Sequence, residues 1–240
     1  MDNKLLQKSK SLNYKLGLNL NCIRFLDNKK EKFELEFNLG KGTSFNTFLF
    51  IEEDLLTIIH PPEITYVEKF LQKVNDYFKE FDLKRINIIT GHISPKIVET
   101  IKNTANNFKN LTITCSVPGK KLICELWQQK KPGKNEYLEV NLPQINLIKK
   151  EMNLDFKNHI FHLIPSPTAR WPGGLIVYEE TSGILFSEKL FSCHLASNEW
   201  SESNRLSTED DRKHFYNCLM TPMSSQITSL AEKISEFDIN

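Results

Sequence analysis

The stretch that decides the fold is RINIITGHISPK, residues 85–96. Its first part, Arg85 to Thr90, has the buried character of a strand inside a parallel sheet. The turn residues 91–93 then lead into a helix, for which Ser94 is the expected N-cap and Pro95 the expected first residue. A buried strand that passes through a turn into a helix is the repeating unit of an α/β fold.

The sequence on either side repeats this alternation. Before it, apolar residues recur at helical spacing from Glu63 to Phe81, after Pro61-Pro62 has ended an earlier strand. After it, the helix carries apolar residues as far as Phe108, Leu111 to Cys115 is expected to form a strand, and SVPGKK opens another helix. The order strand, helix, strand, helix predicts a parallel sheet segment.

The N-terminal part of the chain predicts paired strands instead. From Cys22 to Phe37, short apolar stretches flank a polar turn at Asp27 to Lys32, which indicates a β-hairpin. A second pair is expected from Phe45 to Ile51 and from Leu55 to Ile59, joined by an acidic turn.

The second half of the chain also alternates between strands and helices. Helices are expected from about Thr208 to Met220 and from Ser224 to Phe237. Strands are expected at Tyr137 to Val140, Asn146 to Ile148, His159 to Ile164, Gly174 to Tyr178 and Gly183 to Ser187. Two strand-rich halves, each closed by helices, predict an α/β fold with α+β character, in which two sheets pack face to face inside an αββα sandwich. No repeat or linker divides residues 1–240, which are therefore expected to form one domain.

Composition excludes several classes of protein. The 31 basic and 30 acidic side chains leave a net charge of +1, so no global field favours nucleic acid or an anionic membrane. The five cysteines are scattered and form no C-x-x-C pair, which argues against a disulfide framework or a structural zinc site. The N-terminus lacks the apolar core of a secretion signal and no window is long enough to cross a bilayer, so a cytoplasmic location is expected.

Three stretches could carry chemistry. They are residues 91–96, 165–174 and 185–194. Folds of this class gather ligand groups at the carboxyl edge of the sheet. The sequence therefore predicts that His92, Arg170 and Lys189 face one cleft, with His194 as a further candidate.

Longer motifs in these stretches resemble a known family. KGTSFNTFLF (41–50), PTARWPGGLIVYEETSGILFSEKLFSCHL (167–195) and DDRKHFYNCLMTP (210–222) resemble the metallo-β-lactamase-like domain of flavodiiron proteins. Within that family the chain is most similar to the diflavin flavoproteins of cyanobacteria, in the subtype with substituted iron ligands. The resemblance runs from about residue 22 to residue 237 and implies a C-terminally short sandwich of the metallo-β-lactamase type.

The family implies a redox function. Its members reduce dioxygen to water, or reduce nitric oxide, at a non-haem di-iron centre fed by FMN in a flavodoxin-like domain. In phototrophs a flavin reductase domain takes electrons from a reduced nicotinamide or from ferredoxin, and the electron outlet protects photosystem I. The flavodoxin-like and flavin reductase domains are expected to be absent from this chain, so FMN would lie on a separate domain or on a partner.

The resemblance also implies that most iron ligands are replaced. In the family's first ligand motif only His92 is kept, and the other three positions hold Ser94, Lys96 and Ile97. Arg170 stands where a ligand histidine precedes Trp-Pro, and Lys189 stands where an aspartate bridges the irons. The last ligand histidine lies beyond the family's closing helix, and the sequence ends at Asn240 before reaching it.

These residue types predict that the chain binds no metal. Two adjacent irons need imidazoles, carboxylates and a bridging anion, whereas arginine only donates hydrogen bonds and lysine adds positive charge. Two readings of the basic cluster stay open. In the first, the cluster of His92, Lys96, Arg170 and Lys189 holds an anion such as chloride, sulfate or a carboxylate. In the second, Glu188 and other nearby acids pair with these cations.

The remaining candidates are weaker. His60, His159 and His162 are expected to be ordinary strand or turn histidines rather than ligands. Cys193 and His194 are neighbours, and on a strand they would point to opposite faces. Trp171 and Trp200 are expected in the core or at its rim, and no phosphate-binding glycine motif is present.

Three functions therefore compete. The first is a flavodiiron-type oxidoreductase component, inactive alone, which pairs head to tail with another subunit and depends on its FMN or metal. The second is a non-catalytic structural subunit of a hetero-oligomer with a metal-bearing paralogue. The third, a repurposed hydrolase, is disfavoured because that chemistry uses the same missing ligands.

Overall fold

The computed structural model describes residues 10–28, 32–33, 36–37, 40–130, 137–138, 141–167, 170–200 and 208–240. Its largest element is a seven-stranded sheet in the order β1-β2-β5-β6-β7-β8-β11. These strands are β1 (Lys10–Lys15), β2 (Leu20–Asp27), β5 (Thr43–Glu52), β6 (Leu55–Ile59), β7 (Arg85–Ile89), β8 (Leu111–Ser116) and β11 (Gln144–Ile148). Strands β6, β7, β8 and β11 run parallel to one another, which confirms the predicted parallel segment.

A second, antiparallel sheet has four strands. They are β12 (Met152–Asp155), β13 (Ile160–Pro165), β14 (Leu175–Glu179) and β15 (Ile184–Phe186), in that order. Two further pairs consist of two-residue strands, β3 (Lys32–Phe33) with β4 (Glu36–Phe37) and β9 (Gln129–Lys130) with β10 (Tyr137–Leu138). Residues 139–140 of the strand predicted near Tyr137 lie outside the described residues.

In the described residues, five α-helices flank the sheets. They are α1 (Val67–Glu80), α2 (Pro95–Asn107), α3 (Val117–Trp127), α4 (Glu209–Leu219) and α5 (Ser224–Ile234). Short 3-10 turns precede α1 and α5. The side chain of Ser94 accepts a hydrogen bond from the amide of Ile97, and Ser116 does the same for Gly119, so two helices begin at serine caps followed within two residues by proline.

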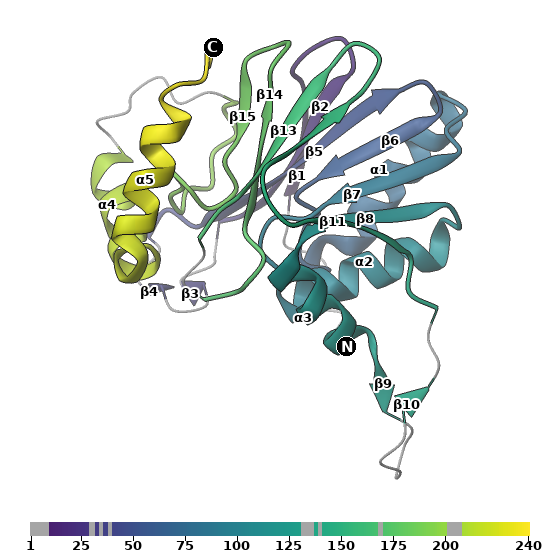
Figure 1. Ribbon diagram of the computed structural model, residues 1–240, viewed down its shortest axis with the longest axis horizontal. Coiled ribbons are helices and arrows are strands. Elements are labelled where there is room, and N and C mark those ends of the chain that lie inside the picture. Colours follow the sequence, from purple (N-terminus) through teal and green to yellow (C-terminus); the bar gives the residue numbers. More distant parts are fainter. Residues whose placement is uncertain are drawn as a thin grey trace.

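The layers can be read from three apolar clusters. One joins α1, α2 and α3 to the outer face of the seven-stranded sheet, and another joins α4 and α5 to the outer face of the four-stranded sheet. The third lies between the sheets and includes Phe50, Ile89, Phe161 and Val177. Helices therefore cover the outside of two facing sheets, as Figure 1 shows, and the predicted αββα sandwich is confirmed.

Three expectations about strands were wrong or incomplete. Strand β2 does not form a hairpin with the segment around Phe37, because it pairs over its whole length with β5 and on its other side with β1. The predicted strand near Asn146 joins the first sheet beside β8 rather than the second. Strands β1 and β12 were not predicted, since neither contains a buried residue or an apolar run.

Among the described residues, no helix combines the length and the apolar character that crossing a bilayer would require.

Candidate functional site

The candidate site lies at the carboxyl ends of two adjacent parallel strands. His60 directly follows β6, and His92 lies three residues after β7. A cleft of about 340 Å³ opens here, closed on its other side by residues 185–194, which follow β14 and include the end of β15. Residues from both sheets thus meet at the edge where this class of fold places its ligand groups.

The centre of the cleft is a buried pair, His92 and Glu188. Nδ1 of His92 and Oε1 of Glu188 form a short hydrogen bond, and both side chains are almost fully shielded from solvent. Burial alone would raise the pKa of Glu188, but the charge and hydrogen bond of His92, with Lys189 and His60 nearby, hold that pKa at about 2. Glu188 is therefore an ionised acceptor at neutral pH, and Nδ1 of His92 carries the shared hydrogen.

The loop that presents Glu188 is conformationally constrained. Glu188 and Phe191 both have positive φ angles, 55° and 64°, which residues other than glycine rarely adopt. The amide of Lys189 donates to Oε2 of Glu188 at 2.6 Å, and the Ser192 hydroxyl donates to the Glu188 carbonyl at 2.8 Å. These bonds hold a backbone that would otherwise cost about 1–3 kcal/mol at each such residue.

Gly91 makes room for this carboxylate. A Cβ atom at Gly91 would lie 2.3 Å from Cγ of Glu188 and 3.2 Å from Cδ2 of His60. The first distance is far inside van der Waals contact, so any side chain here would push Glu188 away from His92. The close approach of Glu188 therefore requires glycine at position 91, directly before His92.

His60 forms the third member of the buried centre. Burial lowers its pKa, an effect that the charge of Glu188 only partly offsets, so the ring is neutral at physiological pH. Its Nε2 lies 3.2 Å from the carbonyl of Leu175 and donates to it, which ties β6 to β14. Sequence reasoning treated His60 as ordinary. One feature of the sequence could have indicated a role for His60. It follows a predicted strand, and the next predicted strand along the chain is the one that precedes His92.

The structure brings together only part of the predicted basic cluster. His92, Lys189 and His194 line the cleft, and Nδ1 of His194 lies 2.8 Å from the Thr43 hydroxyl. Arg170 does not line it. Its guanidinium lies on the exposed surface, 5.4 Å from the centre of the Trp171 ring.

Lys96 also points elsewhere. Its side chain is 52% exposed, and Nζ lies 3.2 Å from Oε2 of the buried Glu63. Ser94 caps α2, and Ile97 packs in the core beneath the first sheet. The expectation of one cleft shared by His92, Arg170 and Lys189 is therefore corrected, because the contacts of Lys96 and Arg170 direct both cations away from it. For His92 and Lys96, the contacts favour pairing with acids.

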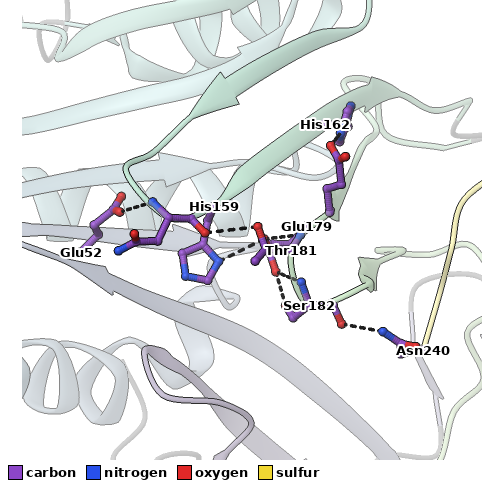
Figure 2. Close-up of polar contacts among 9 residues, drawn as sticks. Glu52, His159, His162, Glu179, Thr181, Ser182 and Asn240 are labelled. Carbon is purple, nitrogen blue, oxygen red and sulfur yellow. Dashed lines mark hydrogen bonds and ion pairs between the residues drawn. The ribbon is translucent and has the colours of Figure 1, made fainter.

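The other histidine candidates are engaged far from this centre. His159 donates from Nδ1 to Oε1 of Glu179 at 3.0 Å, and Nε2 of His162 lies 2.6 Å from Oε2 of Glu180. Figure 2 shows that the Glu179 carboxylate accepts hydrogen bonds from His159, Thr181 and Ser182. These contacts brace the turn between β14 and β15, which is a structural role.

Two further expectations are settled by geometry. Cys193 and His194 lie in an irregular loop rather than on a strand, so both line the cleft instead of facing opposite ways. Trp171 is partly buried, and Trp200 is 41% exposed with its ring 5.2 Å from Tyr14, which confirms positions at the rim.

The donor set does not fit a di-iron centre. Within the described part of the chain, no three histidine, cysteine, aspartate or glutamate side chains are grouped so that they could hold a metal ion. At the centre of the cleft, Glu188 is already committed to His92, whose Nδ1 is used in return. A single carboxylate beside Lys189 cannot offset the repulsion between two divalent ions.

Comparison with known proteins places this geometry in context. A family model described as ODP family beta lactamase matches residues 43–240. A protein of Nostoc sp. (strain PCC 7120) provisionally named diflavin flavoprotein A 6 is 29% identical over 92% of this chain, but that match covers only 37% of the Nostoc protein. The chain thus spans little more than a third of the length of the curated relatives it matches.

Solved structures show the same fold. The flavodiiron core of Flv1 from Synechocystis sp. PCC6803, a metal-soaked crystal, superposes with a TM-score of 0.83 at 24% identity, over 96% of this chain and 55% of the other. A fragment, residues 1–254, of diflavin flavoprotein A 5 from Nostoc superposes with a TM-score of 0.80 at 26% identity, over 96% and 85%. The fold is therefore the metallo-β-lactamase-like fold of flavodiiron cores.

Proposed function

This chain belongs to the ODP family of beta lactamases, and from that premise we propose that it is the β-lactamase-like part of a flavodiiron-type redox component that holds no iron of its own. The buried pair of His92 and Glu188 carries the proposal. It occupies the carboxyl edge where the resemblance places the iron site, and it engages the Glu188 carboxylate, which is the acidic side chain lining this cleft in the described residues.

In this proposal, the residues that stand at the family's ligand positions together deprive the cleft of metal-binding groups. Ser94 and Ile97 serve helix capping and core packing, and Lys96 is held by Glu63, so the segment that follows His92 offers no oxygen or imidazole donor to the cleft. Lys189 adds a cation at the position that the resemblance assigns to a bridging aspartate. Glu188 is hydrogen-bonded to His92 and lies beside Lys189, so a divalent ion that used this carboxylate would have to displace an existing hydrogen bond and approach an amine.

In this function the chain depends on groups located elsewhere. The reduction of dioxygen to water would be carried out by an iron-bearing partner, with FMN supplied by a flavodoxin-like domain or a second subunit. The residues of this chain would keep the edge of the sheet closed and ordered where the partner's reacting groups approach.

The test is oxygen consumption with electrons supplied by a reduced flavodoxin. The chain is first incubated anaerobically with ferrous iron and desalted, and a flavodiiron protein with intact ligands is treated in parallel as the positive control. We expect the chain alone to leave the slow background oxidation of flavodoxin unchanged. A rate that rises in proportion to the concentration of the chain would refute the proposal.

A second candidate is a purely structural subunit of a hetero-oligomer with a metal-bearing paralogue. The exposed ring of Phe191, 55% accessible and held at a positive φ beside the cleft, favours it, since exposed aromatic side chains are common anchors of protein interfaces. Co-expression with such a paralogue separates the two candidates. A structural subunit would co-purify without changing the oxygen rate of the paralogue, whereas a redox component would change it.

A further inference from the structure

The two sheets do not face each other with apolar residues throughout. On the first sheet, Leu56, Ile58, Ile86 and Ile88 point toward the helices, so the residues that alternate with them point toward the second sheet. Near β5 these inward residues are apolar, such as Phe50 and Ile59. Across the parallel strands they become polar: Thr57, Asn87, Thr112, Thr114, Gln144 and Asn146.

Four of these polar residues form one row in register. Thr57 lies opposite Asn87, Asn87 opposite Thr112, and Thr112 opposite Gln144, so the row crosses β6, β7, β8 and β11. The inner face of a packed sheet is normally apolar, because burying amides and hydroxyls without partners is unfavourable. The row is buried at Thr57 and Asn87, half-buried at Thr112 and exposed at Gln144, so water or a polar ligand can reach it from the β11 side.

The hydrogen-bonding groups of the row are incompletely used. Asn87 is only 7% exposed, and its Oδ1 accepts from the Thr114 hydroxyl at 2.8 Å, but its Nδ2 donates to no group in the described residues. The hydroxyl of Thr57, fully buried, likewise has no partner within that part of the chain. Asn87 lines an open cleft, so its unused amide hydrogens are available to a bound water or ligand there.

A cleft of about 650 Å³ opens onto this row. Asn87, Thr112, Gln144 and Asn146 form one wall, and Leu154, Asp155 and Phe156 from the second sheet and the turn after it form the other. Its position at the amino ends of β7, β8 and β11 is opposite to the cleft that contains His92. The volume is in the range of clefts that bind small molecules.

The lining selects for a neutral ligand rich in hydroxyl groups. Amide side chains and threonine hydroxyls each both donate and accept, as sugar hydroxyls do. Arg85, Lys109 and Asp155 also line the cleft, and the Arg85 guanidinium is paired with Asp54, so Lys109 and Asp155 leave opposite charges and no strong bias toward an anion or a cation. The ring of Phe156 and the side chain of Leu154 offer an apolar surface for the C–H face of a sugar ring.

We propose that the cleft lined by Asn87, Gln144 and Asn146 is a binding site for a small neutral polyhydroxylated molecule, a sugar or polyol. The ligand would satisfy the unused amide of Asn87 and bridge β7 to β11 through the amides of Gln144 and Asn146. This site is independent of the function proposed for the other cleft.

Saturation-transfer NMR with glucose, sucrose and glycerol as separate probes tests the proposal. The informative variant is the double substitution Gln144→Ala and Asn146→Ala, since both side chains are at least partly accessible and make no hydrogen bond in the described residues. Gln72→Ala, which removes an exposed amide on α1, is the matched control, and Phe191→Ala perturbs the other cleft.

We expect saturable binding of at least one probe, unchanged in the Gln72→Ala and Phe191→Ala variants. The double variant should bind at least about tenfold more weakly, which corresponds to about 1.4 kcal/mol of lost hydrogen bonding. Absence of saturable binding with all three probes would overturn the proposal. Water alone would then contact the row of polar side chains. Binding that the double variant retains in full would overturn the location.

Discussion

Replacing Glu188 with glutamine tests the buried pair most sharply, because glutamine keeps the size of the side chain and removes its charge. Lowering the pKa of this carboxyl from 4.5 to about 2 corresponds to about 3 kcal/mol of folding stability at neutral pH. The direction of the pH dependence of stability follows from the lowered pKa of Glu188. The stabilisation is complete above pH 4.5 and is lost as the pH falls toward 2, because the unfolded chain then binds the proton more readily.

The assay is urea unfolding followed by tryptophan fluorescence, with wild type and Glu188→Gln measured at a series of pH values from 7 to 3. We expect the variant to be less stable by about 3 kcal/mol at pH 7 and the difference to shrink to about half of that at pH 3. Glu180→Gln is the control, since Glu180 is 53% exposed in its contact with His162 and its loss should cost less than about 1 kcal/mol. A difference between wild type and Glu188→Gln that stays constant with pH would refute the reasoning.

Three further predictions follow from the same geometry. Gly91→Ala should destabilise the protein by about 1–3 kcal/mol, because the new Cβ would overlap Glu188, and thermal unfolding of Gly91→Ala beside Gly40→Ala, where a Cβ meets no atom within 4 Å, measures this directly. Ser94→Ala should cost about 1 kcal/mol through the loss of the α2 cap, whereas Ser94→Thr, which can also cap and adds no charge to this buried position, should retain most of the stability in the same assay. Removing the negative charge of Glu188 should also leave His92 and Lys189 to attract an anion. Glu188→Gln should therefore bind bromide more tightly than wild type in a calorimetric titration. Equal affinity would favour the hypothesis that the basic residues bind an anion over the hypothesis that they pair with acids.

The sequence predicted elements with strong periodicity well. The helix after Pro62 and the strand at Arg85 to Thr90 each have a clear apolar pattern, and both formed where expected. The serine cap of α2 was predicted because its chemistry is local. Strands β1 and β12 were missed, since exposed edge strands have too few apolar residues to stand out from loops.

The site was predicted only in part, for reasons that are three-dimensional. Strand order places His92 at the carboxyl edge, so its position could be inferred from sequence. Glu188 was named only as one of several acids that could pair with the basic residues. Its specific contact with His92 could not be inferred, because Glu188 reaches it through a loop with two positive φ angles that no local pattern specifies. Lys96 and Arg170 were assigned to the cleft by their place in motifs, yet Lys96 lies against Glu63 and Arg170 is exposed beside Trp171.

The central proposal is that the cleft containing the buried pair of His92 and Glu188 holds no metal centre. The most direct measurement is the iron and zinc content of the chain by mass spectrometry after anaerobic incubation with each metal and removal of the excess. The account predicts far less than one metal ion per chain. Two tightly bound irons per chain would contradict it.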